Sequence, residues 1–130
     1  MIFNEDLLIN KIKDAPNGSE LKIFLYIALN QPSEGIRGFE TTKQQLAFDL
    51  GLKLPTVFRS LHWLKGELLI QEVKQVETVD FMVNPRFVMN NSDFQARMDE
   101  WKRRCRLDIQ REIRLSKQKR LRELKKANQK

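Results

Sequence analysis

The sequence predicts a mainly α-helical domain that carries one small β-hairpin and continues into a long C-terminal helix. Two short amphipathic segments meet at Gly51, with a spacing that suits two helices crossing at a steep angle. Two runs rich in β-branched residues follow within 69–83. The last 38 residues, from Asp93 onward, contain no glycine or proline and are rich in strong helix formers. These observations divide the chain into a domain at 1–91 and a helical extension at 92–130.

The first third of the chain predicts two helices. Residues 5–14 place apolar side chains at helical spacing, which favours a short helix or an extended lead-in. A turn at 16–18 follows, and Ser19 is predicted to cap a second helix that ends near Asn30. The stripe of this helix that is expected to face the core is Leu21, Phe24, Leu25, Ala28 and Leu29. Residues 36–40 then predict a loop or a short strand.

The centre of the chain has the pattern of a helix-turn-helix. Thr42 is a good N-cap for a helix at 43–50, and Gly51 supplies the stop after it. A second helix is predicted at 54–66, with Pro55 in the first turn, where its missing N–H costs nothing. The side chains expected to be buried are Leu46, Ala47 and Leu50 on the first helix and Val57, Leu61 and Leu64 on the second. With the hairpin that follows, this is the arrangement of a winged helix-turn-helix.

The composition narrows the classes of function. The chain has one cysteine, Cys105, and one histidine, His62, which leaves no internal disulfide and no cysteine-rich metal site. Glycine-rich phosphate motifs and the G-x-S-x-G nucleophile motif are absent, so we expect no enzymatic activity, no metal and no cofactor. No apolar run approaches the ~18 residues of a membrane helix. The acidic N-terminal segment is unlike a secretory signal, and we therefore expect a cytoplasmic protein that has no membrane partner.

The net charge of +7 is unevenly distributed. Residues 1–94 hold 10 Lys or Arg and 12 Asp or Glu, whereas residues 95–130 hold 14 and 5. A slightly acidic body with a basic tail favours contact between the tail and a polyanion, usually nucleic acid; the alternative is a solvated helix. The predicted wing is also acidic, because its one lysine stands against Glu72, Glu77 and Asp80. We therefore expect the wing to lie away from DNA phosphates.

One side of the predicted 54–66 helix is opposite its buried face and would face the major groove of double-stranded DNA. Arg59 lies at the centre of that side and is expected to bind a guanine or a phosphate. His62 is expected to donate to a base edge or to remain a polar surface residue. Lys53 and Thr56 suit phosphate contacts at the helix start, and Lys65 can reach the DNA backbone. The candidate DNA contacts are Thr42, Lys43, Gln44, Lys53, Pro55, Thr56, Arg59, His62 and Lys65.

Three aromatic residues near this side have other expected roles. Trp63 is expected to pack on the first helix of the pair or to touch DNA. Phe58 is expected in the core or in a subunit contact. Phe48 lies opposite the buried face of its own helix, so it is expected to pack against residues 21–29 or to mark a dimer surface.

The C-terminal helix is predicted to begin with a capping box formed by Ser92 and Gln95. A narrow apolar stripe follows, made of Phe94, Met98, Trp101, Cys105, Ile109 and Ile113. We expect it to pack on the winged domain or on a second subunit, and we expect a homodimer, since a two-fold operator rewards one. Residues 114–130 hold 8 Lys or Arg and one Glu, which predicts a solvent-exposed helix or a disordered tail along the DNA backbone.

The segment from about Leu21 to Asn90 resembles the RepL-type plasmid replication proteins of Gram-positive bacteria. The resemblance rests on FLYIALNQ, TTKQQLAFDLGLKLPTVFRSLHWL and FMVNPRFVMNN, and most of all on Asn84-Pro85 directly after the second wing strand. Thr56 and Arg59 match a T-V-x-R stretch that is similar in the family. The resemblance implies a cytoplasmic protein of a plasmid that binds its replication origin and recruits host replication proteins.

Three functions are therefore predicted in order of preference. The first is a sequence-specific protein that binds double-stranded DNA as a plasmid replication initiator or accessory factor. The second is a winged-helix transcriptional repressor, which differs in biological output and not in contact chemistry. The third is a module whose winged domain docks on another protein, and the acidic wing is the evidence for it.

Overall fold

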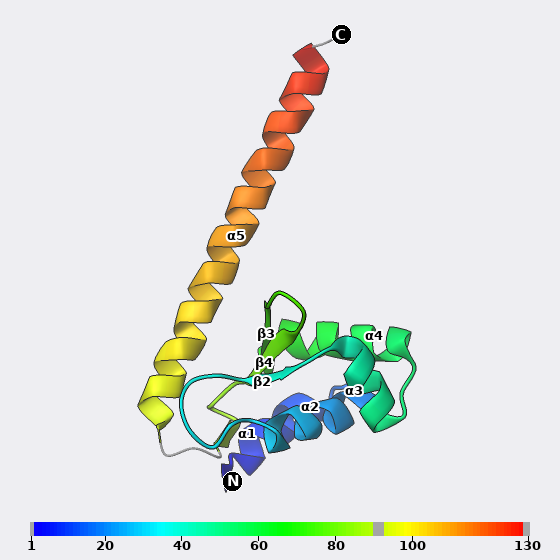
Figure 1. Ribbon diagram of the computed structural model, residues 1–130, viewed down its shortest axis with the longest axis vertical. Coiled ribbons are helices and arrows are strands. Elements are labelled where there is room, and N and C mark those ends of the chain that lie inside the picture. The colour runs from blue at the N-terminus through cyan, green and yellow to red at the C-terminus, as the bar shows by residue number, and fades with distance from the viewer. Residues whose placement is uncertain (1, 90–92, 129–130) are drawn as a thin grey trace.

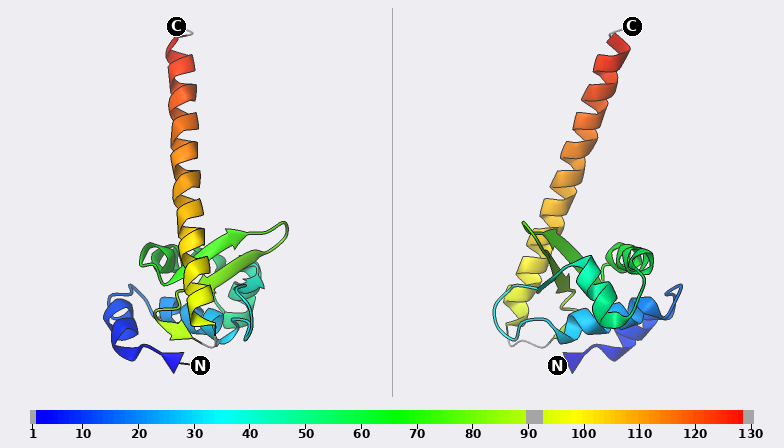
Figure 2. Two further views of the ribbon diagram at one scale, coloured as in Figure 1. Left: turned by 90° about the vertical axis from the view of Figure 1, so that its left-hand side faces the viewer. Right: turned by 45° about the vertical axis from the view of Figure 1, so that its right-hand side comes forward.

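The computed structural model describes residues 2–89 and 93–128, and it has the predicted winged helix-turn-helix followed by a long helix (Figure 1). The helices are α1 Glu5–Ile12, α2 Ser19–Leu29, α3 Lys43–Leu50, α4 Leu54–Gly66 and α5 Phe94–Asn128. In both views of Figure 2, α1 and α2 lie on one side of the domain, whereas α4 and the tip of the hairpin lie on the other. The fold class predicted from the sequence is confirmed. None of the helices described is long and apolar enough to cross a membrane.

The sheet is antiparallel and has the order β2-β4-β3. Its strands are β2 Phe39–Thr41, β3 Ile70–Lys74 and β4 Val79–Val83, so the predicted hairpin is confirmed with a shorter first strand. A second pairing joins β1 Ile2–Phe3 to β5 Val88–Met89. The sequence did not predict this pairing, because two-residue strands carry no periodic signal.

The turns of the helix-turn-helix follow the local chemistry that was predicted. Thr42 Oγ1 accepts a hydrogen bond from the backbone N–H of Gln45 at 3.0 Å, which caps α3. Gly51 ends α3 with φ of +63°, a conformation that only glycine adopts at little cost. Pro55 lies in the first turn of α4. These three positions fix where the two helices begin and end.

The buried side of α2 differs from the predicted stripe. Leu21 and Leu29 are 37% and 63% exposed, so their predicted places in the core are wrong. The side that packs on α4 and β4 carries Glu20, Ile23, Phe24, Ile27 and Ala28. Apolar residues surround most of α2, so its own pattern could not select the buried side, and packing against the neighbouring elements decided it.

The start of α2 also differs from prediction. Gly18 is the N-cap, and Ser19 is the first residue inside the helix, so the predicted capping role of Ser19 is wrong. The Ser19 hydroxyl instead lies 2.8 Å from the Ser60 hydroxyl on α4, where the two share a hydrogen bond. Glu20 accepts from the backbone N–H of Asn17 at 3.1 Å, which satisfies an otherwise buried carboxylate.

Helix α5 packs on the domain through its first third and then extends away from it (Figures 1 and 2). Met98 and Trp101 are 8% and 5% exposed, and Cys105 is half-buried. The other members of the apolar stripe, Phe94, Ile109 and Ile113, are 47%, 58% and 51% exposed. All residues from 106 to 128 are exposed, and they continue the helix to Asn128. The predicted capping residue Ser92 lies outside the described residues.

Gly38 is expected to tolerate no side chain, because it precedes β2 in close contact with β4. A Cβ atom there would lie 2.3 Å from both Asp80 Oδ1 and the backbone oxygen of Phe81. We expect Gly38→Ala to lower the free energy of unfolding by about 2 kcal/mol or more, because backbone must move. Urea unfolding measures this effect. Gly66→Ala is the control, since no atom lies within 4 Å of its added Cβ; equal midpoints for the two variants would contradict the prediction.

Candidate nucleic-acid interface

The exposed side of α4 is the centre of the candidate interface. Val57, Ser60, Leu61 and Leu64 are buried, and they face the layer that contains α2. The opposite side presents Pro55, Arg59 and His62, all exposed. Thr56 and Trp63 lie at its margin, each half-buried, and Trp63 packs against the hydrophobic core. The structure thus places three of the predicted contacts together on one accessible helical surface.

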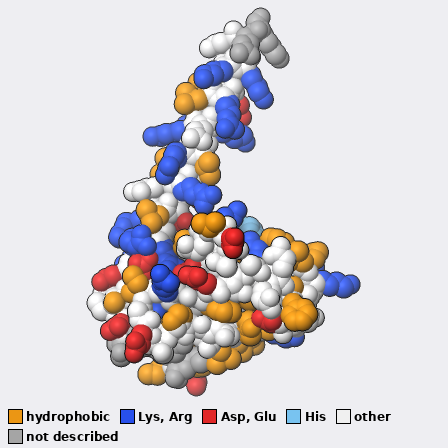
Figure 3. Space-filling model, viewed as in Figure 1, with side chains coloured by type: hydrophobic (Ala, Val, Ile, Leu, Met, Phe, Trp, Pro, Cys, Tyr) orange, Lys and Arg blue, Asp and Glu red, His pale blue; other side chains and the backbone are white. Residues whose placement is uncertain are grey.

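This surface lies on the side of the domain toward which α5 extends. Figures 1 and 2 show α4 and the hairpin tip on that side, with α1 and α2 on the opposite one. Lys and Arg side chains gather along the projecting part of α5 in Figure 3, with few acidic groups among them. A polyanion that lay on α4 would therefore also lie near a strongly basic helix.

The predicted contacts at the starts of the two helices have different environments. Gln44 and Lys53 are exposed, and Lys53 is the N-cap of α4 with no side-chain capping bond. Thr42 is half-buried, and its hydroxyl oxygen already accepts the capping hydrogen bond. Lys53 and the first N–H groups of α4 are therefore the positive groups that this end offers to an anion.

Lys43 and Lys65, the remaining predicted contacts, both pair with Glu72 of β3. Lys43 Nζ lies 3.4 Å from Glu72 Oε2, and Lys65 Nζ lies 3.3 Å from Glu72 Oε1. Lys43 Nζ also lies 4.7 Å from the centroid of the Phe58 ring, in a cation–π contact. Both lysines therefore have an intramolecular partner that the sequence alone did not reveal.

The wing is less acidic at its surface than the sequence indicated. Asp80 is 3% exposed and pairs with Arg104 of α5, and Glu72 is occupied by the two lysines. Only Glu77 of the three acidic residues is exposed, and Lys74 near it is exposed too. Two of the three acids therefore have cationic partners within the protein, and the expectation that the wing lies away from DNA phosphates stays a prediction.

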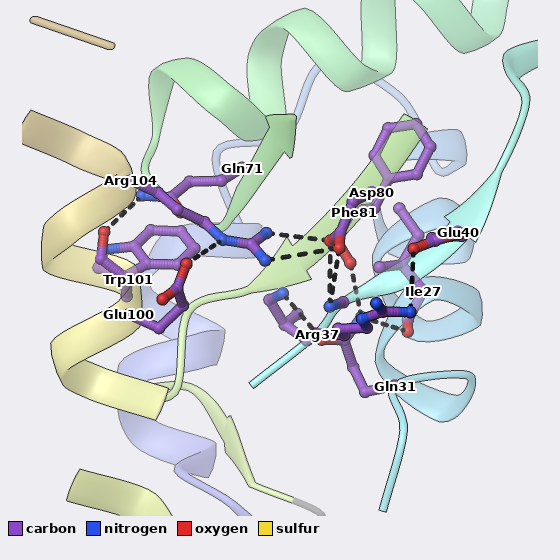
Figure 4. A network of polar contacts seen from close by, with 12 residues as sticks. Ile27, Gln31, Arg37, Glu40, Gln71, Asp80, Phe81, Glu100, Trp101 and Arg104 are labelled. Atoms are coloured by element: carbon purple, nitrogen blue, oxygen red, sulfur yellow. Dashed lines mark hydrogen bonds and ion pairs between the residues drawn. The ribbon is translucent and has the colours of Figure 1, made fainter. Parts of the chain in front are cut away.

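A buried polar network joins α5 to the domain (Figure 4). Arg104 donates from Nη1 to Asp80 Oδ1 at 2.9 Å and from Nε to Glu100 Oε1 at 3.1 Å. Asp80 Oδ1 also accepts from the backbone N–H of Gly38 at 3.0 Å. Arg104 and Asp80 are 7% and 3% exposed. This arrangement satisfies two opposite charges inside the protein and fixes the direction in which α5 leaves it.

Arg97 forms the second half of the network. Its guanidinium donates to Gln31 Oε1 and to the backbone oxygens of Gly35 and Arg37 at 2.9–3.2 Å. Burial is the main cause that lowers the pKa of Arg97. Hydrogen bonds from Arg103 and then Arg104 hold the pKa of Glu100 below its ordinary value, although burial opposes them. Two arginines of the basic tail, Arg97 and Arg104, are therefore buried and make contacts inside the protein.

Arg97 and Arg104 are two of the 14 basic residues that the sequence places in the tail at 95–130. A signal was present, because Arg97, Trp101 and Arg104 recur at helical spacing and share the buried side of α5. Cys105 lies beside them, and Gln71 Nε2 donates to its Sγ at 2.8 Å. Burial raises the pKa of this thiol.

Two exposed phenylalanines flank the helix pair. Phe48 is 83% exposed, so its expected packing against residues 21–29 is wrong. Phe58 is 46% exposed, so the expectation of a core position is wrong for it as well. Phe58 lies beside Arg59 on α4, and its ring supports Lys43. A subunit contact for either ring stays a prediction.

Comparisons with known proteins give fold-level similarity only. No protein-family model matches the chain, and no curated protein matches it. Among solved structures, reduced HlyU from Vibrio cholerae is 17% identical, with 76% of this chain and 85% of that chain covered at a TM-score of 0.43. A homodimeric winged helix-turn-helix DNA-binding domain from Mycobacterium bovis, described as a possible ArsR-family transcriptional regulator, is 16% identical; the match covers 88% of this chain and 91% of that chain, at a TM-score of 0.43. Neither similarity assigns the chain to a family.

Proposed function

We propose that this protein binds double-stranded DNA sequence-specifically and regulates transcription by occupying an operator. The observation that carries the proposal is the exposed side of α4, where Pro55, Arg59 and His62 stand on the side from which the basic part of α5 extends. A helix of this kind fits the major groove, and each base pair presents a distinct donor and acceptor pattern there.

Arg59 is the group that we assign to base recognition. It lies at the middle of the exposed side of α4, and it forms no ion pair with any other residue in the part of the chain described. A guanidinium in this place fits the O6 and N7 acceptors of a guanine. Lys53 at the start of the helix suits a phosphate that fixes the register of α4.

Helix α5 supplies the sequence-independent part of the affinity. Residues 106–128 extend about 35 Å at the rise of an α-helix, long enough to follow several phosphates. Their positive charge would displace counterions from the DNA backbone, so binding should weaken steeply with salt. The exposed Ile109 and Ile113 remain available for a second copy of the chain, and we propose a homodimer on a two-fold site.

Repression is the output that we prefer, because blocking a promoter requires nothing beyond operator occupancy. Replication initiation, implied by the RepL resemblance, requires in addition that host proteins be recruited, and no family model supports that resemblance. The protein-docking alternative rested on the acidic wing. Glu72 pairs with two lysines and Asp80 pairs with Arg104, so the wing offers a partner protein little exposed negative charge.

The test is Arg59→Ala on a duplex selected by the wild-type protein from a random library. We expect affinity for that duplex to fall by about 10- to 100-fold, the effect of losing one bidentate base contact of roughly 1–3 kcal/mol. Fluorescence anisotropy measures the loss. Arg86→Ala is the matched control, because it removes the same charge from an exposed site after β4.

Two outcomes would contradict the proposal. If Arg59→Ala binds the selected duplex as tightly as Arg86→Ala, α4 does not read bases through Arg59. If the wild-type protein selects no duplex and its DNA affinity is insensitive to salt, the chain is not a DNA-binding protein.

A further inference from the structure

Glu72 occupies a place where three elements of the candidate interface meet. It belongs to β3, and its carboxylate lies between Lys43 of α3 and Lys65 of α4, at 3.4 Å and 3.3 Å from the two ammonium nitrogens. Its side chain is 10% exposed, whereas those of Lys43 and Lys65 are 20% and 39% exposed. One carboxylate thus draws two cations of the helix-turn-helix inward.

The two lysines lie at the margin of the exposed side of α4. Lys65 follows His62 by three positions, and so lies one turn further along the helix. Lys43 reaches the same margin from α3, where its ammonium group rests over the ring of Phe58, the neighbour of Arg59. A DNA strand lying against Arg59 and His62 would therefore place phosphates near both ammonium groups.

The contacts of Glu72 are suited to exchange. Glu72 Oε1 makes no hydrogen bond within the part of the chain that the structure describes, although Lys65 Nζ lies 3.3 Å away. The attraction between Lys65 Nζ and Glu72 Oε1 is therefore electrostatic, without the directed hydrogen bond of a strong ion pair. A phosphate offers the same negative charge and more acceptor oxygens, so it can replace the carboxylate as the partner of either lysine.

We propose that Glu72 is an internal competitor for DNA phosphate. In the free protein it holds Lys43 and Lys65, and this lowers affinity for DNA of any sequence while leaving Arg59 free to read bases. Glu72 thereby sets the ratio between specific and non-specific binding. This inference rests on the DNA-binding function proposed above and assigns new roles to two residues first predicted as simple phosphate contacts.

The test is Glu72→Gln, which preserves the shape of the side chain and removes its charge. Affinity is measured by anisotropy against a selected duplex and a scrambled duplex over a series of KCl concentrations. We expect affinity for the scrambled duplex to rise about 10-fold near 0.1 M salt, and the slope of log affinity against log salt to steepen by about 1–2, since up to two lysines become available to phosphates. The ratio of specific to non-specific affinity should fall.

Glu67→Gln is the matched control. It changes net charge by the same amount and also releases a lysine, because Glu67 Oε2 pairs with Lys11 Nζ at 3.3 Å. Lys11 belongs to α1 and meets Glu67 just after the C-terminal end of α4, beyond the exposed side that carries Pro55, Arg59 and His62, so this variant should keep the wild-type slope.

A second set of variants tests the proposal without depending on how well Glu72→Gln folds. Lys43→Gln and Lys65→Gln together should lower scrambled-duplex affinity less in the wild-type background than in the Glu72→Gln background, because Glu72 already holds both lysines in the wild-type protein. In the Glu72→Gln background the same pair should abolish the gain.

Three results would overturn the proposal. The first is a Glu72→Gln slope equal to that of Glu67→Gln, and the second is a loss on replacing the two lysines that is as large in the wild-type background as in the Glu72→Gln background. The third is a wild-type protein that binds no duplex even at low salt, which overturns the DNA-binding function as well. Binding of the selected duplex with unchanged slopes overturns the role of Glu72 alone.

Discussion

Asp80→Ala is expected to lower the free energy of unfolding by about 3–5 kcal/mol, because it removes one of the two carboxylates that hold the buried Arg104 and leaves that charge only partly compensated. Arg104 is 7% exposed and donates to Asp80 Oδ1 at 2.9 Å. The same substitution removes the acceptor of the Gly38 N–H, which is paired with Asp80 at 3.0 Å. A guanidinium held only by Glu100 and an unpaired backbone donor would then lie between α5 and the sheet.

Urea unfolding of the full chain measures this loss. Arg103→Ala is the control, because Arg103 also pairs with Glu100 but its side chain is 54% exposed, and exposed pairs contribute about 0–1 kcal/mol. The double variant Asp80→Asn with Arg104→Met should recover most of the stability, since it removes both charges and keeps an acceptor for Gly38. An Asp80→Ala loss no larger than that of Arg103→Ala would show that the network does not anchor α5.

Removal of residues 114–130 is expected to have the largest effect on DNA binding. This segment holds 8 Lys or Arg and one Glu, and its described part is an exposed helix. If about half of these cations meet phosphates, affinity should fall by about 100-fold or more at low salt, and the salt slope should become shallower by about 3–4. The loss should be the same for selected and scrambled duplexes, because backbone contacts carry no sequence information.

A full-length variant separates charge from chain length. Replacing Lys117, Lys119, Lys125 and Lys126 with glutamine preserves the helix and the apolar residues, and it should reproduce about half of the slope change. Titrations of each protein over a KCl series measure both effects. A loss confined to the selected duplex, or a truncation that binds as the full chain does, would contradict the role assigned to the tail.

The sequence by itself determined the elements whose causes are local. Thr42 sets the start of α3 because its hydroxyl caps a nearby N–H group, and Gly51 sets the end because glycine adopts positive φ at little cost. Both effects act within a few residues of the chain. Val57, Leu61 and Leu64 predicted the buried side of α4 because they recur at helical spacing on an otherwise polar helix. The hairpin followed from two β-branched runs around a short turn.

Only the tertiary structure decided which charged groups are free. Asp80 was predicted at the surface of the wing, and Arg104 in a basic tail, yet the two form a buried pair across 24 positions of sequence. Glu72 meets Lys43 and Lys65 from a different element in the same way. A sequence pattern records the spacing of charges along the chain, whereas their partners depend on how distant elements pack. The helix that meets DNA was therefore predictable, and the charges that surround it were not.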